Sequence, residues 1–173
     1  MLICIDAAYR EDIGVACGIV FDNLSSSTPL GCHALSIEGL PGYVPGSFYL
    51  REMPLAVKVL QGLDEELEMV FIDAYVWLPG RRAGFGAHLY NALNGRTPVI
   101  GMAKKRFNAH HSCVRVLRGG SNRPLYVTAA GISEVMAAKI VREMAGRYRV
   151  PDMMRLADQQ ARRLLAKEKT VYG

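Results

Sequence analysis

Three acidic residues stand at positions where a metal site would need them. Asp6 closes the apolar run of residues 1–5, Asp73 closes a second apolar run at residues 69–72, and Glu52 follows a turn-rich segment at the expected start of a helix. A carboxylate at the end of a buried strand is costly unless it is paired or bound to a cation. Two such carboxylates on neighbouring strands and one from a helix form an oxygen cage suited to Mg²⁺. Magnesium held in this way activates water and neutralises the charge on a phosphodiester, so the triad predicts phosphodiester chemistry. Taken singly, Asp6 and Asp73 could instead be strand-end caps.

The size and composition of the chain predict one domain over residues 1–173. Half of the 173 residues are hydrophobic, enough for a single sizeable core. No apolar stretch reaches the roughly 18 residues that cross a bilayer, and the N-terminus lacks the basic region of a signal peptide. We therefore expect a cytoplasmic protein with no membrane partner. The four cysteines form no CxxC pattern, which predicts reduced and mostly buried thiols rather than a zinc site.

The net charge of +5 is distributed unevenly along the chain. A set of basic residues gathers between residues 81 and 123: Arg81, Arg82, Lys104, Lys105, Arg106, Arg115, Arg118 and Arg123. A local basic field favours a polyanionic partner, of which nucleic acid is the commonest. The run from Lys104 to Arg106 could alternatively be a solvated surface segment.

The order of the expected elements predicts a mixed α/β fold. Three strands come first, then alternating helices and strands, then a C-terminal helix from about residue 151, with Pro54 in the first turn of the first helix. The expected strands cover residues 2–6, 13–21, 30–37, 69–73, 97–103 and 124–129, and the expected helices include 83–93 and 133–146. This order is typical of an antiparallel meander that leads into parallel strands, with helices flanking a mixed central sheet. An RNase H-like domain has this order and carries carboxylates at its strand ends.

Several motifs, taken together and in order, resemble the endonuclease V family of inosine-directed nucleases. The resemblance runs from about Ile5 to Asp158, as in a short member that lacks the family's N-terminal segment. Its pieces are Tyr43-Val44-Pro45-Gly46, the segment 48–55 containing Glu52, the strand 70–73, then Arg81-Arg82, Gly84 and His88, the strand with Lys104 and Lys105 at 98–105, and the segments 148–151 and 155–158.

The resemblance implies a role for each of these positions. Asp6, Glu52 and Asp73 would hold Mg²⁺, with Mn²⁺ as a substitute, and Lys104 would contact the scissile phosphate or its leaving oxygen. Tyr43 would replace an extruded base in the helix, and Gly46 would let the backbone approach that base. The remaining nucleic-acid contacts would come from Pro45, Arg81, Arg82 and Lys105, and the base pocket would include Ala74. The family's reaction is hydrolysis of the second phosphodiester 3′ to inosine in DNA or RNA, and the expected substrate is single-stranded or locally distorted.

Some positions depart from the family pattern. The family's Gly-His-Gly after the second aspartate is Ala74-Tyr75-Val76 here, and Ala130-Gly131 replace a histidine expected after the strand at 124–129. These positions help to read the base and to support the metal. One alternative is therefore a nucleic-acid-binding relative with weak or lost catalysis. Another is an α/β domain that binds an unrelated small phosphate ligand. His88, Trp77 and Tyr43 also have ordinary structural interpretations, as packed or turn residues.

Overall fold

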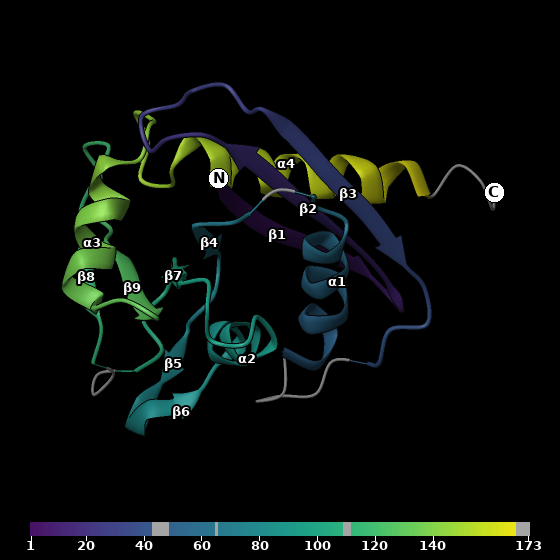
Figure 1. Ribbon diagram of the computed structural model, residues 1–173, viewed down its shortest axis with the longest axis horizontal. Coiled ribbons are helices and arrows are strands. Elements are labelled where there is room, and N and C mark those ends of the chain that lie inside the picture. Colours follow the sequence, from purple (N-terminus) through teal and green to yellow (C-terminus); the bar gives the residue numbers. More distant parts are fainter. Residues whose placement is uncertain (43–48, 65, 109–111, 169–173) are drawn as a thin grey trace.

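The computed structural model describes residues 1–42, 49–64, 66–108 and 112–168. Within these residues the chain forms a seven-stranded mixed sheet and a small two-stranded hairpin (Figure 1). The large sheet has the strand order β3-β2-β1-β4-β7-β9-β8. Its strands are β1 (Leu2–Arg10), β2 (Ile13–Phe21), β3 (Gly31–Ile37), β4 (Met69–Ile72), β7 (Val99–Ala103), β8 (Val114–Val116) and β9 (Leu125–Ala130). The hairpin consists of β5 (Trp77–Leu78) and β6 (Arg82–Ala83), joined by a single 3₁₀ turn at Pro79–Arg81.

The directions of the strands agree only partly with the sequence prediction. Strands β1, β2 and β3 form the expected antiparallel meander, and β1, β4 and β7 run parallel to one another. Strand β9 runs antiparallel to both of its neighbours, β7 and β8, which the sequence pattern did not indicate. The prediction missed β8 because it is only three residues long and carries an arginine at its centre.

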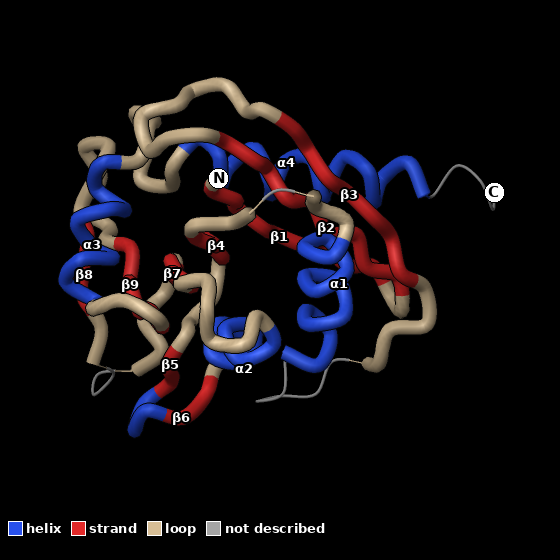
Figure 2. Tube along the Cα trace, in the orientation of Figure 1, coloured by secondary structure: helices blue, strands red, loops and turns tan. Residues whose placement is uncertain are grey.

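Four helices cover the two faces of the sheet (Figures 1 and 2). Helices α1 (Tyr49–Gln61) and α2 (Phe85–Ala92) pack on one face, and α3 (Glu134–Glu143) and α4 (Asp152–Lys167) pack on the other. The side chain of Ser133 caps α3 by accepting a hydrogen bond from the backbone N–H of Met136 at 3.2 Å, as an N-cap serine does. The sheet is therefore the middle layer of three and is buried on both faces, which is why its central strands are almost entirely apolar.

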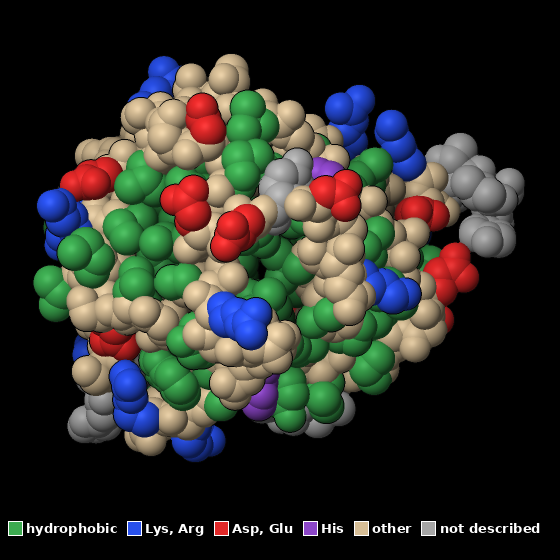
Figure 3. All heavy atoms as spheres, in the orientation of Figure 1, with side chains coloured by type: hydrophobic (Ala, Val, Ile, Leu, Met, Phe, Trp, Pro, Cys, Tyr) green, Lys and Arg blue, Asp and Glu red, His purple; other side chains and the backbone are tan. Residues whose placement is uncertain are grey.

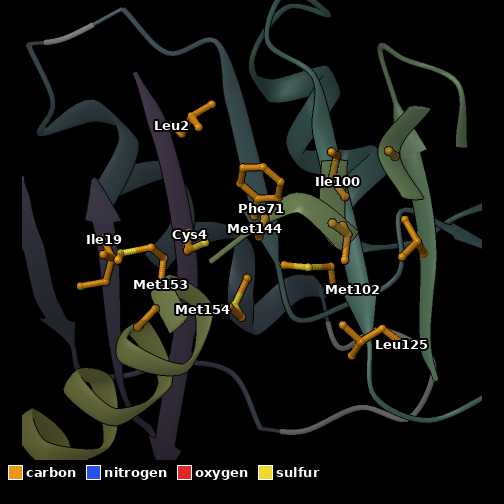
Figure 4. Close-up of a cluster of buried hydrophobic side chains, with 14 of the residues drawn as sticks. Leu2, Cys4, Ile19, Phe71, Ile100, Met102, Leu125, Met144, Met153 and Met154 are labelled. Atoms are coloured by element: carbon orange, nitrogen blue, oxygen red, sulfur yellow. The ribbon is translucent and has the colours of Figure 1, made fainter. Parts of the chain in front are cut away.

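Strand β1 shows how the two cores are divided. Ile3 and Ile5 face α1 and α2, whereas Leu2 and Cys4 face α3 and α4. The core on the α3 and α4 side also contains the methionines drawn in Figure 4. Because side chains alternate along a strand, the next residue on the Leu2 and Cys4 face is Asp6.

The structure corrects two further details. Pro54 lies inside α1 rather than in its first turn, because the helix already begins at Tyr49. All four cysteines are free, and Cys4 and Cys17 are buried as expected, but Cys32 is exposed on the edge strand β3. None of the described helices is both long enough and apolar enough to span a membrane.

Candidate active site

Two parallel strands place the first pair of acidic residues side by side. Ile5 of β1 lies beside Ile72 of β4, and Asp6 and Asp73 are the residues that follow. Strand β4 ends there, while β1 continues as the long hairpin with β2, so Asp6 lies within a strand and Asp73 begins a loop. The Oδ1 atom of Asp6 accepts a hydrogen bond from the backbone N–H of Ala7 at 2.8 Å.

The third carboxylate arrives from a helix. Glu52 is in the first turn of α1, and together with Asp6 and Asp73 it lines one small cavity. Apolar side chains close the rest of this cavity, including Ala56 and Phe85. The structure thus brings together the three acids that the sequence predicted, in surroundings with little water to separate their charges.

This crowding changes how readily the acids ionise. Burial, followed by the charge of Asp73, raises the pKa of Asp6 from 3.8 to about 7, although the hydrogen bond from Ala7 and the charge of Lys104 act against it. Burial and the charges of Asp6 and Asp73 raise the pKa of Glu52 from 4.5 to about 8, and the nearby Tyr9 hydroxyl opposes that rise. Without a cation, the site therefore resists carrying three negative charges at neutral pH.

Lys104 supplies a positive charge at the same place. It follows directly after β7, and its Nζ forms an ion pair with Oδ2 of Asp73. Partial burial by itself would lower the pKa of Lys104, but the contact with Asp73 and the nearby acids outweigh burial and raise it. Lys104 is therefore a charged ammonium group fixed beside the acids, as a contact for an anionic oxygen requires.

The acids are of the type that a hard divalent cation prefers as ligands, but they are not arranged as a complete coordination sphere. In the parts of the chain that the structure describes, no three His, Cys, Asp or Glu side chains are grouped closely enough to coordinate an ion. The donor set is nevertheless all carboxylate, and burial, together with the charges of the neighbouring acids, raises the pKa of Asp6 to about 7 and that of Glu52 to about 8. A divalent cation would relieve that repulsion, so the residues fit such an ion chemically. Their role as ligands stays a prediction.

A fourth acid belongs to this region. Asp158 of α4 acts electrostatically on both Asp6 and Lys104, raising the pKa of each. Its Oδ1 accepts a hydrogen bond from Nε of Arg162 at 2.7 Å. The sequence prediction included Asp158 in a motif but gave it no role. The available signal was its spacing, because Asp158 lies on the buried stripe of α4 between Met154 and Ala161, where an acid is out of place.

Beside the acids lies a much larger cavity of about 740 Å³. Ala74, a predicted base-pocket residue, lines it, as do Asp73 and Lys104. Tyr75 and Phe107 form an aromatic part of its wall, with ring centroids 6.3 Å apart and nearly perpendicular planes. The Tyr75 hydroxyl donates to the backbone carbonyl of Lys105 at 2.7 Å. The cavity is thus mainly apolar and aromatic, with charged groups at the end nearest the acids.

Two neighbouring side chains that the sequence left open have structural contacts. The ring of His88 stacks on that of Tyr49 with centroids 4.0 Å apart. Nε1 of Trp77 donates to the carbonyl of Ala129 at 2.8 Å, which ties the small hairpin to β9. These contacts agree with the structural interpretation of His88 and place Trp77 beside the large cavity, because its neighbour Leu78 lines it.

The other predicted contact residues fall into three groups. Tyr43, Pro45 and Gly46 lie outside the described residues. Lys105 is exposed and lines the large cavity. Arg81 and Arg82 are exposed on the small hairpin and do not line the large cavity. The Arg81 guanidinium lies 4.8 Å from the Trp77 ring centroid, and Arg82 Nε donates to a backbone carbonyl of the same turn.

The predicted basic field is also less uniform than its spacing indicated. Arg118 turns inward and donates to the backbone carbonyls of Met144, Ala145, Gly146 and Arg149. It therefore fastens a loop and is not a surface contact. On the face shown in Figure 3, basic and acidic side chains are interspersed.

Comparison with known proteins gives a consistent result. The family model described as Endonuclease V matches residues 1–121. The chain is 29% identical to Endonuclease V of Azotobacter vinelandii, over 92% of this chain and 80% of that protein. It is 33% identical to Endonuclease V of Alkalilimnicola ehrlichii, over 69% of this chain and 60% of that protein.

Solved structures agree with the sequence relatives. The endonuclease V structure from Streptomyces avermitilis superposes with a TM-score of 0.82 at 25% identity, over 97% of this chain and 82% of that one. Ciona intestinalis endonuclease V, solved with a 23mer DNA that contains an inosine followed by a ribo-adenosine, gives a TM-score of 0.81 at 20% identity, over 96% of this chain and 85% of that one. These likenesses confirm the predicted RNase H-like fold with its mixed central sheet.

Proposed function

The chain belongs to the endonuclease V family, and we propose that it is a metal-dependent nuclease that hydrolyses a phosphodiester near inosine, a deaminated base, in DNA or RNA. The observation that supports this most directly is the meeting of Asp6, Glu52 and Asp73 in one cavity with Lys104 ion-paired at its edge. Acids that raise one another's pKa in this way gain from binding a divalent cation. An ammonium group beside them gains from contact with a phosphate.

In this proposal each residue has a separate task. Asp6, Glu52 and Asp73 hold Mg²⁺, or Mn²⁺ in its place, and the ion supplies Lewis-acid activation of water and neutralisation of phosphate charge. Lys104 exchanges its contact with Asp73 for one with the scissile phosphate, where it stabilises the charge that develops on the leaving oxygen. The Tyr9 hydroxyl lies near Glu52 and favours its ionised form. The large cavity beside Lys104 receives the base.

The nucleic-acid substrate is expected to be single-stranded or locally distorted at the cleaved bond. An extruded base must leave its stack, and this costs least where pairing is already weak. Tyr75 and Ala74 replace residues through which the family reads the base, and the Tyr75 hydroxyl is already bonded to the Lys105 carbonyl. We therefore propose cleavage with only a modest preference for inosine.

The deciding experiment compares labelled oligonucleotides with and without inosine, in Mg²⁺ and in EDTA. We expect cleavage by the wild type only with the metal and no cleavage by Asp73→Asn, which keeps the shape of the side chain but loses a charged ligand. Asp64→Asn is the matched control, because Asp64 is exposed on the loop before β4. In thermal unfolding, Mg²⁺ should raise the Tm of wild type and control more than that of Asp73→Asn.

A binding protein with weak or lost catalysis is the second candidate. The substituted positions at Ala74 and Tyr75 and the ion pair that engages Asp73 favour it. It would replace the nuclease proposal if wild-type protein bound these oligonucleotides but nicked none of them with Mg²⁺ or Mn²⁺.

A further inference from the structure

A second cavity meets the large one at a single side chain. This cavity, of about 450 Å³, lies between the loop after β8 and the start of α4. Lys104 and Asp158 form the end nearest the acids, and the remaining wall includes Gly119, Ser121, Arg149 and Arg155. Among the described residues, Lys104 is the only one that lines both cavities. If a strand places a base in the large cavity and a phosphate on Lys104, its next phosphate therefore lies at the second cavity.

Arg118 and Gly119 hold together the two loops that form the wall of this second cavity. The Arg118 guanidinium donates to four carbonyls of the segment after α3: that of Met144, and those of Arg149 at 3.5 Å, Ala145 at 3.4 Å and Gly146 at 3.3 Å. Gly119 has a φ of +63°, and a Cβ added there would lie 2.3 Å from the backbone of Tyr148. Only glycine therefore allows the two loops to pack this closely. These contacts hold the loop after β8 against the segment before α4.

Its charges favour an anion. The described residues that line it carry three cations, Lys104, Arg149 and Arg155, and one acid, Asp158. Asp158 pairs with Arg162, whereas Lys104 and Arg155 are themselves paired with Asp73 and Asp152, so Arg149 is the cation of this wall that has no acidic partner among the described residues. The electrostatic balance at the wall is thus positive, which attracts a phosphate group.

The two arginines also retain unused hydrogen-bond donors. One guanidinium nitrogen of Arg155 bonds Asp152 at 3.0 Å and its Cζ lies 5.0 Å from the Tyr148 ring centroid, while its buried Nε has no hydrogen-bond partner among the described residues. The Arg149 side chain makes no hydrogen bond or ion pair within the described part of the chain; only its carbonyl is engaged, by Arg118. A buried donor without a partner is costly, and a bound phosphate oxygen would supply one.

We propose that this cavity binds a phosphodiester of the substrate strand on the 3′ side of the bond that is cleaved, with Arg149 and Arg155 as its contacts. The direction rests on the proposed function, since it takes the base in the large cavity to lie 5′ of the cut. The base and the 3′ strand would then lie on either side of Lys104. Three contacts would hold the scissile phosphate against the acids: the base in the large cavity, Lys104, and the 3′ phosphodiester in the second cavity. Such positioning is how a nuclease aligns its substrate for attack.

The test measures binding separately from cleavage. A 5′-labelled, inosine-containing strand is titrated in EDTA with wild-type protein, Arg149→Ala, Arg149→Lys and the control Arg163→Ala. Arg163 is exposed on α4, two turns beyond Arg155. We expect Arg149→Ala to weaken binding about tenfold and to reduce the slope of log Kd against log salt by about 1, as loss of one phosphate contact does. Arg149→Lys should retain most of the affinity, and Arg163→Ala should behave as wild type.

A neutral linkage locates the contact on the strand. Replacing one phosphodiester by a methylphosphonate, at each position 3′ of the cut in turn, should weaken wild-type binding at one position. There the same replacement should have little further effect on Arg149→Ala, because the contact is already lost. Thermal unfolding shows whether each variant is folded. If Arg149→Ala is not folded, Arg149→Lys still tests whether a positive charge at this position supports strand binding.

Three outcomes would overturn the inference. The first is equal affinity and salt slope for Arg149→Ala and Arg163→Ala. The second is a methylphosphonate effect of the same size in wild type and Arg149→Ala at every 3′ position. The third is that inorganic phosphate stabilises wild type but not Arg149→Ala while strand affinity is unchanged, which would assign the cavity to a free anion. Absence of cleavage alongside the expected binding pattern would count against the nuclease proposal and leave this inference standing.

Discussion

Replacing Asp6 by asparagine should stabilise the metal-free protein, and more so at higher pH. In the folded protein burial and Asp73 raise the pKa of Asp6 from 3.8 to about 7. Between these two values the folded protein binds more protons than the unfolded chain does, so stability falls as the pH rises through that window. Each tenfold change in acidity corresponds to about 1.36 kcal/mol, so the ionised Asp6 costs about 4 kcal/mol in the folded state above about pH 7. Asparagine has nearly the same shape and carries no charge.

The assay is urea unfolding in EDTA, followed by circular dichroism, for wild type, Asp6→Asn and the exposed control Asp64→Asn. We expect Asp6→Asn to raise the free energy of unfolding by about 4 kcal/mol at about pH 8.5 and by about 2 kcal/mol at about pH 5.5, where the wild-type carboxyl is protonated in the folded state. Asp64→Asn should show no such difference between the two pH values. A stabilisation of Asp6→Asn that is the same at both, or that is larger at the lower pH, would refute the reasoning that buried charge destabilises this site.

Two further predictions concern binding and packing. Oligonucleotide affinity should fall steeply as salt rises, because lysine and arginine side chains release counterions from the phosphates; fluorescence anisotropy over a salt series checks this, and a salt-independent affinity would remove nucleic acid as the partner. Gly101→Ala should lower the free energy of unfolding by about 1–3 kcal/mol, because its Cβ would lie 2.3 Å from the Ala74 carbonyl oxygen, whereas Gly62→Ala, with contacts at 3.6 Å, should change it much less in the same urea assay.

The fold was predictable to the extent that each element carries its own pattern. Strands β2 and β4 and helix α3 are bounded by turn residues or by a capping serine, and the prediction placed them within a few residues. Strand β8 and the small hairpin were not predictable in this way. They are two or three residues long and are stabilised by neighbours distant in the sequence, such as the bond from Trp77 to Ala129. Local periodicity carries no record of such contacts.

The site was predictable for a different reason. Asp6 and Asp73 end apolar runs of the sequence, and the parallel pairing of β1 and β4 sets them side by side, although β1 continues beyond Asp6 to Arg10 and Asp6 is not a strand end as predicted. No comparable rule could bring in Asp158, which reaches the acids only because α4 packs across β1 and β2. Nor could spacing show that Arg118 turns inward, since its partners are carbonyls of a loop more than twenty residues later. The charged residues of the sequence predict a basic electrostatic field, but only the folded structure shows which of them, unlike Arg118, remain on the surface.

The same crowding that makes the site unstable without a cation also accounts for the position of Lys104. Its ammonium pairs with Asp73 and lowers the pKa of Asp6, so it partly offsets the repulsion among the acids. A divalent cation bound to the acids and a phosphate bound to Lys104 would together replace the ion pair between Lys104 and Asp73. Binding of either one therefore makes room for the other, and we expect metal and substrate to bind more tightly together than separately. Lys104 lines both cavities, so in the proposed mechanism this exchange would link the position of the strand to metal binding.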